Sequence, residues 1–118
     1  TLHVLGKDIR LDLDKLNEYM NSKDITVATF PCKVSEQFIL QDNHSLRMLV
    51  SGGEKLNLNK NTHYQLVNAY GPTENTVVTT SFLLNKNDDN IAIGKPVYKT
   101  KIYIVNKYNQ LCPFEVIG

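Results

Sequence analysis

Residues 64–74 read Tyr64-Gln65-Leu66-Val67-Asn68-Ala69-Tyr70-Gly71-Pro72-Thr73-Glu74, an apolar stretch that runs into a turn. The first six residues predict a β-strand. Gly71 and Pro72 predict that it ends in a stiff turn, because Gly permits close backbone approach and Pro fixes its own φ. Ligand sites of α/β proteins usually lie beyond the carboxyl ends of strands. We therefore expect a ligand-binding turn here.

The side chains of this turn suit a nucleotide. Tyr70 offers an aromatic ring on which a base can stack, and Gly71 lets a ligand approach the backbone. Thr73 supplies a hydroxyl for a phosphate oxygen, and Glu74 supplies a carboxylate for Mg²⁺, a hard cation commonly shared with substrate phosphates. The same residue types are also typical of an ordinary turn, so the turn alone leaves both interpretations open.

A second strand and glycine turn precede this one. Met48-Leu49-Val50 is a short continuous apolar run, followed directly by Ser51-Gly52-Gly53. Such a run is typical of a strand covered on both faces in a parallel sheet. Parallel strands place their carboxyl ends at one edge, so we expect the two glycine turns to be neighbours.

The N-terminal third predicts alternating strands and helices. Leu2–Leu5 indicates a short strand, and Asp12 is a good N-cap for a helix whose Leu13, Leu16 and Met20 share one face. The β-branched run 25–30 predicts the next strand, and the Pro at position 31 predicts a helix from there to about residue 39.

The C-terminal half is less regular. The Asn-rich segment Asn57–Thr62 predicts at most a short helix, Thr76–Leu84 a strand, and Asn85–Asn90 a solvated loop. Ile102–Val105 and the residues near Leu111 predict a β-hairpin. Residues 1–118 are thus expected to form a single α/β domain, with a mostly parallel sheet flanked by helices and a C-terminal β-hairpin.

Composition excludes several classes of protein. Apolar residues make up 42% of the 118 positions, the formal net charge is +1, and the 13 basic residues are scattered. We therefore expect neither a membrane nor a nucleic-acid partner. Cys32 and Cys112 indicate reduced thiols in a cytoplasmic protein, and His3, His44 and His63 lack metal-site spacing. Phosphate-loop, dinucleotide-binding and zinc-protease motifs are absent from the sequence.

Five stretches in this order resemble the amino-acid-activating adenylation domains of nonribosomal peptide synthetases, members of the adenylate-forming enzyme superfamily. They are Thr26–Pro31, Leu49–Leu56, Asn68–Glu74, Ile93–Pro96 and Lys101–Val105. The resemblance covers nearly the whole chain and implies a central fragment of an AMP-binding domain. The sequence does not begin with Met, which also leads us to expect an excised segment.

The resemblance implies an ATP- and Mg²⁺-dependent ligase. Relatives convert an amino acid to an aminoacyl-adenylate and then transfer it to the phosphopantetheine thiol of a peptidyl carrier domain, a reaction typical of antibiotic biosynthesis. By position, Tyr70 stacks on adenine, Asn68 binds its exocyclic amine, and Thr73 contacts the α-phosphate. Glu74 holds Mg²⁺, so Thr73 and Glu74 are the expected catalytic residues. The expected ATP-binding residues are Gly53, Asn68, Ala69, Tyr70, Gly71 and Thr73.

The resemblance also implies an amino-acid pocket. The matching positions are Thr29, Val50, Gly52, Ala69, Val77 and Val78. All are small or apolar, which predicts a large hydrophobic or aromatic substrate.

This sequence differs from the family pattern at some positions and lacks some of its motifs. Asn75 and Glu115 differ from common family residues, and several catalytic elements of the family have no counterpart in this segment. We therefore expect the isolated chain to fold but not to adenylate. Two alternatives remain open: another adenylate-forming ligase, such as a D-alanine–carrier protein ligase or an acyl-CoA synthetase, or a non-catalytic binding or scaffold fragment.

Overall fold

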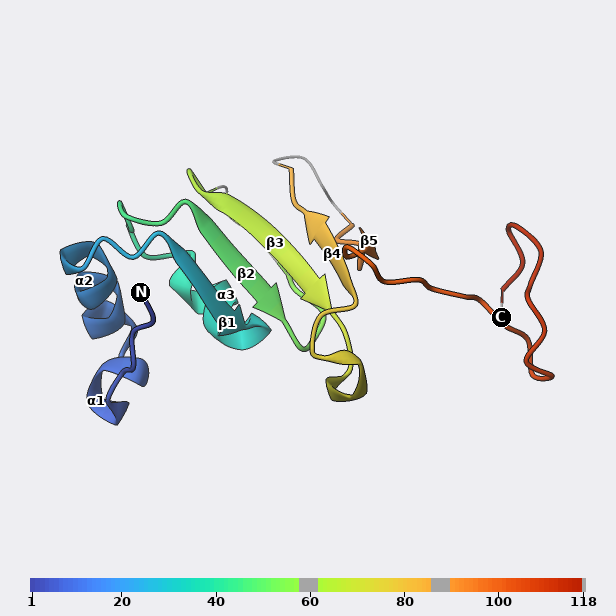
Figure 1. Cartoon of the computed structure of the whole chain (residues 1–118). Helices are drawn as coiled ribbons and strands as arrows, with labels where there is room; N and C mark the ends of the chain where they lie inside the picture. Colours follow the sequence, from blue (N-terminus) through green and yellow to red (C-terminus); the bar gives the residue numbers. More distant parts are fainter. Residues whose placement is uncertain (58–61, 86–89, 118) are drawn as a thin grey trace.

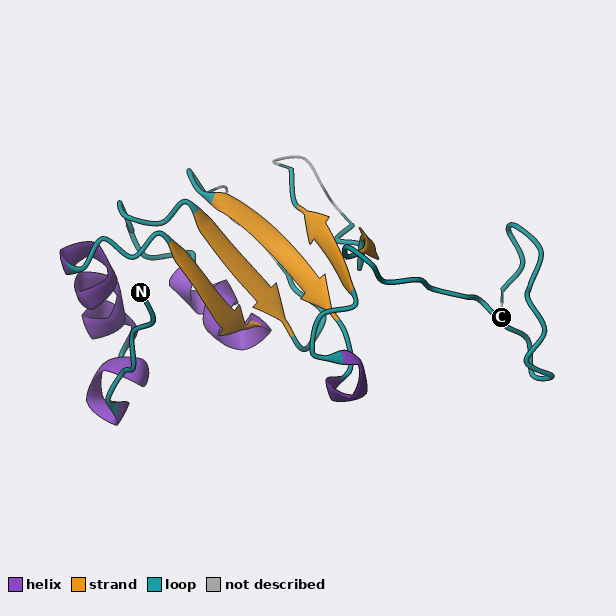
Figure 2. Ribbon diagram, in the orientation of Figure 1, coloured by secondary structure: helices purple, strands orange, loops and turns teal. Residues whose placement is uncertain are grey.

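The protein forms a five-stranded sheet; one helix lies against one face, and the two N-terminal helices lie beside the first edge strand (Figures 1 and 2). The computed structural model describes residues 1–57, 62–85 and 90–117. The predicted α/β class is confirmed. In chain order the elements are α1 (Lys7–Arg10), α2 (Leu13–Ser22), β1 (Val27–Pro31), α3 (Cys32–Phe38), β2 (Met48–Gly52), β3 (Gln65–Tyr70), the 3-10 helix η1 (Thr73–Asn75), β4 (Thr80–Leu83) and β5 (Lys95–Pro96).

The sheet order follows the chain, β1-β2-β3-β4-β5. Strands β1, β2 and β3 are parallel, whereas β4 and β5 each pair antiparallel with the preceding strand. The three parallel strands are the longest, and their carboxyl ends lie at the same edge of the sheet (Figure 1). This arrangement confirms that the two predicted glycine turns belong to neighbouring strands.

The hydrophobic core lies between one face of the sheet and helices α2 and α3. Leu16 and Met20 of α2 pack with Phe38 of α3 against Leu49 and Leu66 of the central strands. Side chains alternate between the two faces of a strand, so the neighbours of Leu49 and Leu66 point to the other face. In the described chain no helix covers that second face (Figure 2). The expectation that β2 is covered on both faces is therefore wrong for this chain.

Helix α2 begins where its capping residue predicts. Asp12 Oδ1 accepts hydrogen bonds from the backbone N–H groups of Asp14 (3.1 Å) and Lys15 (3.2 Å). These bonds satisfy donors that have no partner within the helix, and they hold the pKa of the Asp12 carboxyl below its usual value, the Lys15 bond contributing most. Helix α3 ends at Phe38, close to the predicted end.

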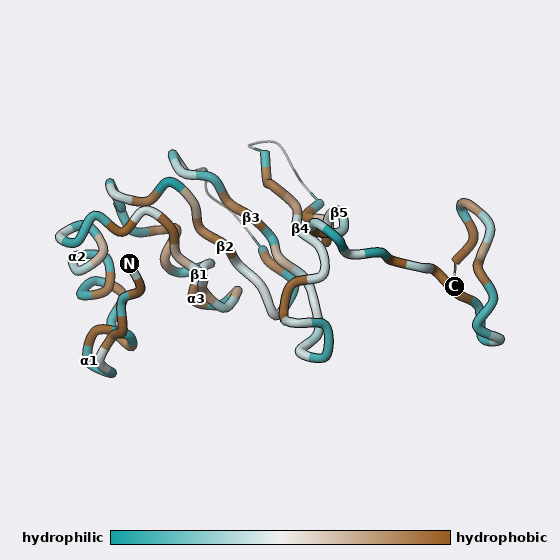
Figure 3. The backbone as a smooth tube through the Cα atoms, in the orientation of Figure 1, coloured by the Kyte–Doolittle hydropathy of each residue, from teal (hydrophilic) through white to brown (hydrophobic). Residues whose placement is uncertain are grey.

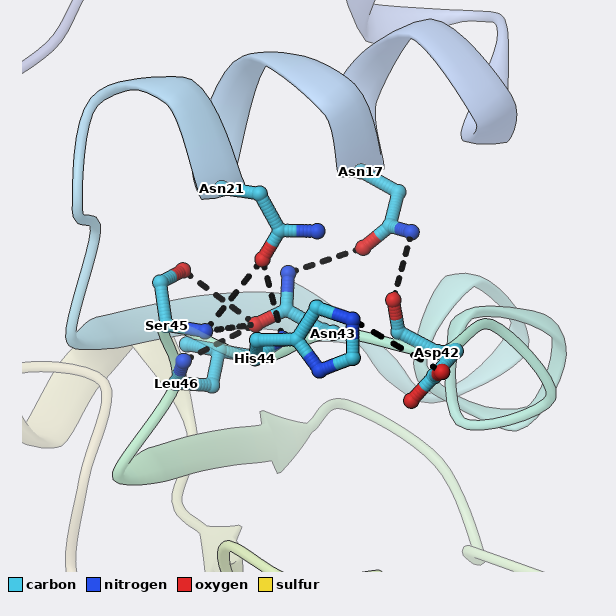
Figure 4. A network of polar contacts seen from close by, with 7 residues as sticks. All are labelled: Asn17, Asn21, Asp42, Asn43, His44, Ser45 and Leu46. Carbon is cyan, nitrogen blue, oxygen red and sulfur yellow. Dashed lines mark hydrogen bonds and ion pairs between the residues drawn. The ribbon is translucent and has the colours of Figure 1, made fainter.

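A polar network connects α2 to the loop before β2 (Figure 4). Asn43 is fully buried, and its Oδ1 accepts from the backbone N–H groups of Leu46 (2.8 Å) and Ser45 (3.1 Å). Its Nδ2 donates to Asn17 Oδ1 at 2.8 Å, and Asn21 Oδ1 accepts from Ser45 N at 3.2 Å. The network fixes the entry of the chain into the sheet.

Two expectations for the N-terminal and C-terminal ends differ from the structure. Leu2–Leu5 is not a strand; Leu2 and Val4 are exposed. His3 instead contacts α2, with 3.0 Å between His3 Nδ1 and Tyr19 Oη. A short apolar run cannot form a strand without a partner strand, and the sequence does not reveal whether one is present.

The predicted C-terminal hairpin is reduced to one antiparallel bridge, Val105 with Leu111. It lies on an extended arm after β5, where hydrophobic residues recur away from the sheet (Figure 3). The expectations for Asn57–Thr62 and Asn85–Asn90 fall mostly outside the described residues.

Both cysteines are free, in agreement with the expectation of reduced thiols. Within residues 1–57, 62–85 and 90–117, no helix has the length and apolar character needed to cross a bilayer.

Candidate functional site

The candidate site is built where β2 and β3 end side by side. Gly52 pairs with Ala69 in the parallel register, and Ser51 pairs with Asn68. A Cβ added to Gly52 would lie 2.7 Å from the carbonyl oxygen of Ala69. Only glycine allows this approach, so the two strand ends that carry the glycine turns are held in direct contact.

The glycine turn after β2 leaves open space above it. Gly53 has a φ of +103°, a conformation that disfavours side chains, and a Cβ placed there would meet no described atom within 4 Å. A flat ligand could lie against this backbone.

Helix α3 holds the segment that follows this glycine turn. The buried Cys32 Sγ donates to the carbonyl oxygen of Glu54 at 3.0 Å. Glu36 Oε1 accepts from Asn57 N at 2.9 Å, and this backbone bond contributes most to lowering the pKa of the Glu36 carboxyl. Two hydrogen bonds to helix α3 thus hold the segment after the glycine turn in place.

The turn after β3 folds back onto its own strand. Thr79 N donates to the Tyr70 carbonyl oxygen at 2.8 Å, and a Cβ on Gly71 would lie 2.5 Å from the carbonyl oxygen of Val77. The short helix η1, Thr73–Asn75, forms the outer part of this loop. Gly71 is required because the returning chain occupies the place of a side chain.

This closure corrects the predicted strand Thr76–Leu84. The strand begins only at Thr80, and Thr76 and Val77 adopt left-handed φ values of 55° and 72°. Such values are unusual for β-branched residues, whose sequence preference is extended. The contacts of the returning loop, including Val77 N to the Pro72 carbonyl oxygen at 3.3 Å, override that preference.

The predicted nucleotide and metal residues are exposed at this loop. Tyr70 is about half exposed, at 52%, and the side chains of Thr73 and Glu74 face solvent. Among the described residues, none forms an ion pair with Glu74. The Glu74 carboxylate lies exposed on the outer part of the loop.

Asn68 differs from these residues because it is buried. It is 7% exposed, and its Nδ2 donates to the carbonyl oxygen of Ala92 at 2.9 Å. Ala92 lies 24 residues after Asn68, so this hydrogen bond joins two segments that are distant in the sequence.

Four of the six predicted pocket residues share one face of the sheet. Thr29 pairs with Val50 in one row, and Gly52 pairs with Ala69 in the next. Residues two apart on a strand point to the same face, so the two rows adjoin on the face that the helices leave uncovered. Val77 and Val78 lie outside the register, exposed in the loop between η1 and β4. The structure thus brings four of these residues together.

Two contributors to the site do not follow from the sequence. The motif 93–96 is part of the family resemblance, but the sequence suggests no role for it. The hydrogen bond between Asn68 and Ala92, the residue before this motif, forms only in the tertiary structure. Thr80 pairs with Tyr70, and its hydroxyl is buried without a hydrogen-bond partner in the described chain. Thr80 is one of several Thr residues in the β-branched run 76–80, and the sequence does not distinguish it from the others.

Comparisons with known proteins agree with this arrangement. A family model described as AMP-binding enzyme matches residues 1–118. Bacitracin synthase 1 of Bacillus licheniformis is 54% identical over 118 residues, which are 100% of this chain and 2% of that protein. Surfactin synthase subunit 2 of Bacillus subtilis (strain 168) is 42% identical over 117 residues, 99% of this chain and 3% of that protein. The chain therefore spans a small part of these relatives.

Solved structures show the same fold. PA1221, a nonribosomal peptide synthetase protein containing adenylation and PCP domains, superposes with a TM-score of 0.76 at 26% identity, over 92% of this chain and 24% of that chain. The four-domain nonribosomal peptide synthetase AB3403, whose structure was solved bound to AMP and glycine, has a TM-score of 0.76 at 25% identity. That match covers 94% of this chain and 9% of the other.

Proposed function

Because the chain belongs to the AMP-binding enzyme family, we propose that it forms the nucleotide- and amino-acid-binding part of an adenylation domain in a nonribosomal peptide synthetase. In this proposal the parent protein converts an amino acid and ATP to an aminoacyl-adenylate and pyrophosphate. The acyl group then passes to the thiol of a carrier domain. The 54% identity to bacitracin synthase 1 over the full chain favours this member of the family.

The observation that carries the proposal is the register of the parallel strands. It aligns Thr29 with Val50 and Gly52 with Ala69, and it places both rows beside the Gly53 turn and the Tyr70 loop. An amino acid on this face and a nucleotide across the two turns would meet at one sheet edge. Such proximity is a large part of what a reaction between two anions requires.

The residues of the loop supply distinct functions in this proposal. Tyr70 stacks on the adenine and the Gly53 backbone offers a flat surface beside it. The Thr73 hydroxyl donates to an α-phosphate oxygen while the carboxylate of the amino acid attacks the α-phosphorus. The bond from that phosphorus to pyrophosphate breaks, and the electron pair leaves with pyrophosphate.

Glu74 suits the Mg²⁺ that such chemistry uses. Mg²⁺ is usually bound by one or two carboxylates plus substrate phosphates, and an exposed carboxylate without an ion pair in the described chain fits that role. When bound, the ion neutralises charge on the phosphates.

The amino acid in this proposal is large and uncharged. The aligned residues Thr29, Val50, Gly52 and Ala69 are small or apolar and offer no countercharge for a charged side chain. A screen of amino acids by ATP–pyrophosphate exchange with the intact parent protein tests this point. The expected result is strongest exchange with an aromatic or large aliphatic amino acid; a preference for an acidic or basic one would contradict it.

The central test is Glu74→Ala in the intact protein. Loss of a carboxylate that acts mainly in the transition state should lower amino-acid-dependent exchange on the order of a hundredfold, with a smaller change in the Kd for ATP. Glu18→Ala is the matched control, because Glu18 is an exposed carboxylate on helix α2. Equal exchange rates in both variants would refute the role of Glu74.

The same measurements separate the alternatives. Exchange that depends on D-alanine or on a fatty acid would indicate another adenylate-forming ligase. An intact protein that Mg·ATP does not stabilise, and that is indifferent to Glu74→Ala, would indicate a binding or scaffold role.

A further inference from the structure

We propose that Cys32 is a positioning residue for nucleotide binding: its buried thiol fixes the glycine turn Gly52–Gly53 by bonding to the chain on both sides of that turn. The inference rests on the proposed function, because the backbone of this turn is the surface that would lie beside the adenine. It assigns a role to a side chain that belongs neither to the loop after β3 nor to the aligned pocket residues.

The first step is the place of Cys32 in the fold. Strand β1 ends at Pro31, which pairs with Gly52 of β2 in the parallel register. Cys32 follows directly as the first residue of α3, a helix that lies against β1 and β2 (Figure 1). Its side chain is buried. The register thus brings the thiol to the strand end at which the glycine turn begins.

The second step is the pair of hydrogen bonds that the sulfur makes. Ser51 Oγ donates to Cys32 Sγ at 3.5 Å, and the thiol donates to the Glu54 carbonyl oxygen at 3.0 Å. Ser51 comes immediately before Gly52–Gly53, and Glu54 comes immediately after. A single side chain therefore connects the two flanks of the turn. A thiol can do this because it both donates and accepts a hydrogen bond, whereas an alanine side chain does neither.

The third step is why this turn needs support. Glycine is conformationally permissive, and Gly53 has no side chain that could pack on the side open to a ligand. One helical turn after Cys32, Glu36 Oε1 accepts from Asn57 N at 2.9 Å and from Asn57 Nδ2 at 3.5 Å. Residues four apart lie on the same face of a helix. Cys32 and Glu36 thus hold the turn and the segment after it from one face of α3.

The expected effect concerns binding rather than the chemical step. A backbone beside the adenine makes the same contact in the ground state and in the transition state, and loss of such a contact raises KM while kcat stays nearly unchanged. Cys32→Ala removes the bond to Glu54 and leaves the buried Ser51 hydroxyl without its sulfur acceptor. In the intact parent protein, the KM for ATP in pyrophosphate exchange should therefore rise on the order of tenfold.

Two further variants separate hydrogen bonding from packing. Cys32→Ser should restore most of the affinity for ATP, because a hydroxyl also donates and accepts. Ser35→Ala is the matched control, because Ser35 is also buried on α3 but its hydroxyl donates to the Phe30 carbonyl oxygen, outside the turn. It should keep the wild-type KM. Circular dichroism checks that each variant is folded.

If Cys32→Ala does not fold, Glu36→Ala gives a second test. That variant releases Asn57 and also removes the ion pair with Lys33, an exposed pair within α3. Lys33→Ala is its control, because it removes the ion pair and leaves the bonds to Asn57. The KM for ATP should rise several-fold in Glu36→Ala and stay unchanged in Lys33→Ala.

The outcomes distinguish this inference from the proposed function. If the intact wild type neither binds ATP nor exchanges pyrophosphate, the proposed function fails and this inference fails with it. If the wild type is active and folded Cys32→Ala has an unchanged KM for ATP, only the inference is overturned. An equal rise in Ser35→Ala, or a rise that Cys32→Ser does not reverse, would also overturn it. In the second test, equal KM values for Glu36→Ala and Lys33→Ala would have the same consequence.

Discussion

At the scale of single residues, the site depends on positions where a side chain would collide. A Cβ added to Gly52 or to Gly71 would lie less than 3 Å from a backbone carbonyl oxygen, whereas Gly53 faces open space. The first two glycines therefore bring strands and loop together. Gly53 instead supplies a turn conformation and leaves room for a ligand. These are different physical reasons for the same residue type.

Gly71→Ala should disturb the signature loop. The new methyl would lie 2.5 Å from the Val77 carbonyl oxygen and 2.6 Å from Thr79 N, so the returning chain must move. Strain of about 1–3 kcal/mol is typical of such overpacking. We expect the affinity of the intact protein for ATP to fall by roughly tenfold, measured by calorimetry. Gly6→Ala should leave it unchanged, and an unchanged Kd for Gly71→Ala would show that the loop absorbs the methyl.

At the scale of elements, polar contacts hold helix α2 in place, and the sequence predicts only some of them. Its N-terminus follows from Asp12, a local signal. Its attachment to the loop before β2 depends on Asn43, whose partner on the helix, Asn17, lies 26 residues away along the chain. A polar residue in a loop gives no hint that it will be buried and fully bonded.

Asp12→Ala should lower the urea midpoint of the 118-residue chain at pH 7. The folded state lowers the pKa of Asp12, so its stabilising contribution is present above the ordinary pKa of about 3.9 and is lost as the pH falls through the lower folded-state value. The difference between wild type and variant should therefore shrink below about pH 4. Asp12→Asn retains an Oδ1 acceptor and should keep the cap at every pH; a pH-independent difference for Asp12→Ala would contradict this account.

Asn43→Ala should lower the free energy of unfolding more than an alanine substitution at an exposed residue nearby. It leaves the buried N–H of Leu46 without its 2.8 Å partner and removes a packed side chain, which together cost roughly 2–4 kcal/mol in the free energy of unfolding. Asn17→Ala is the control; it removes the bonds to Asn43 Nδ2 and to the Asp42 carbonyl oxygen but leaves those from Ser45 N and Leu46 N to Asn43 Oδ1, so it should cost less, about 1–2 kcal/mol. Urea unfolding measures both, and equal losses would show that the backbone contacts of Asn43 add nothing.

At the scale of the whole molecule, the chain is more elongated than a compact domain. Its radius of gyration is 16.8 Å, compared with about 13.5 Å for a compact chain of this length. The difference comes from the arm after β5, where Tyr98, Phe114 and Ile117 are at least 90% exposed. Hydrophobic stabilisation therefore comes from the α/β part, between the helices and one face of the sheet.

The isolated chain should fold without catalysing adenylation. The α/β part contains a continuous core, so we expect a cooperative urea transition followed by circular dichroism. Residues 1–118 carry the loop with Thr73 and Glu74, but the pocket face is uncovered on the described chain and cannot exclude water. We expect no amino-acid-dependent ATP–pyrophosphate exchange across a panel of amino acids. The intact parent protein is the positive control, and measurable exchange by the isolated chain would disprove this expectation.

The sequence alone predicted what depends on neighbours in the chain. The cap at Asp12, the helix after Pro31, the strand before Gly52 and the turn at Gly71 all follow from preferences that act within a few residues. The order of the family motifs was also sufficient for the family, which the match over residues 1–118 confirms. The roles of the site residues stay predictions.

Only the tertiary structure decided which distant residues meet. The pairing of Gly52 with Ala69, the left-handed Thr76 and Val77, and the contact between Ala92 and Asn68 depend on hydrogen bonds between segments that are separated along the chain. Local preference even gave the wrong answer for Thr76 and Val77, because β-branched residues favour strands in isolation. Long-range hydrogen bonds and close backbone packing fix one arrangement among the several that each local segment permits.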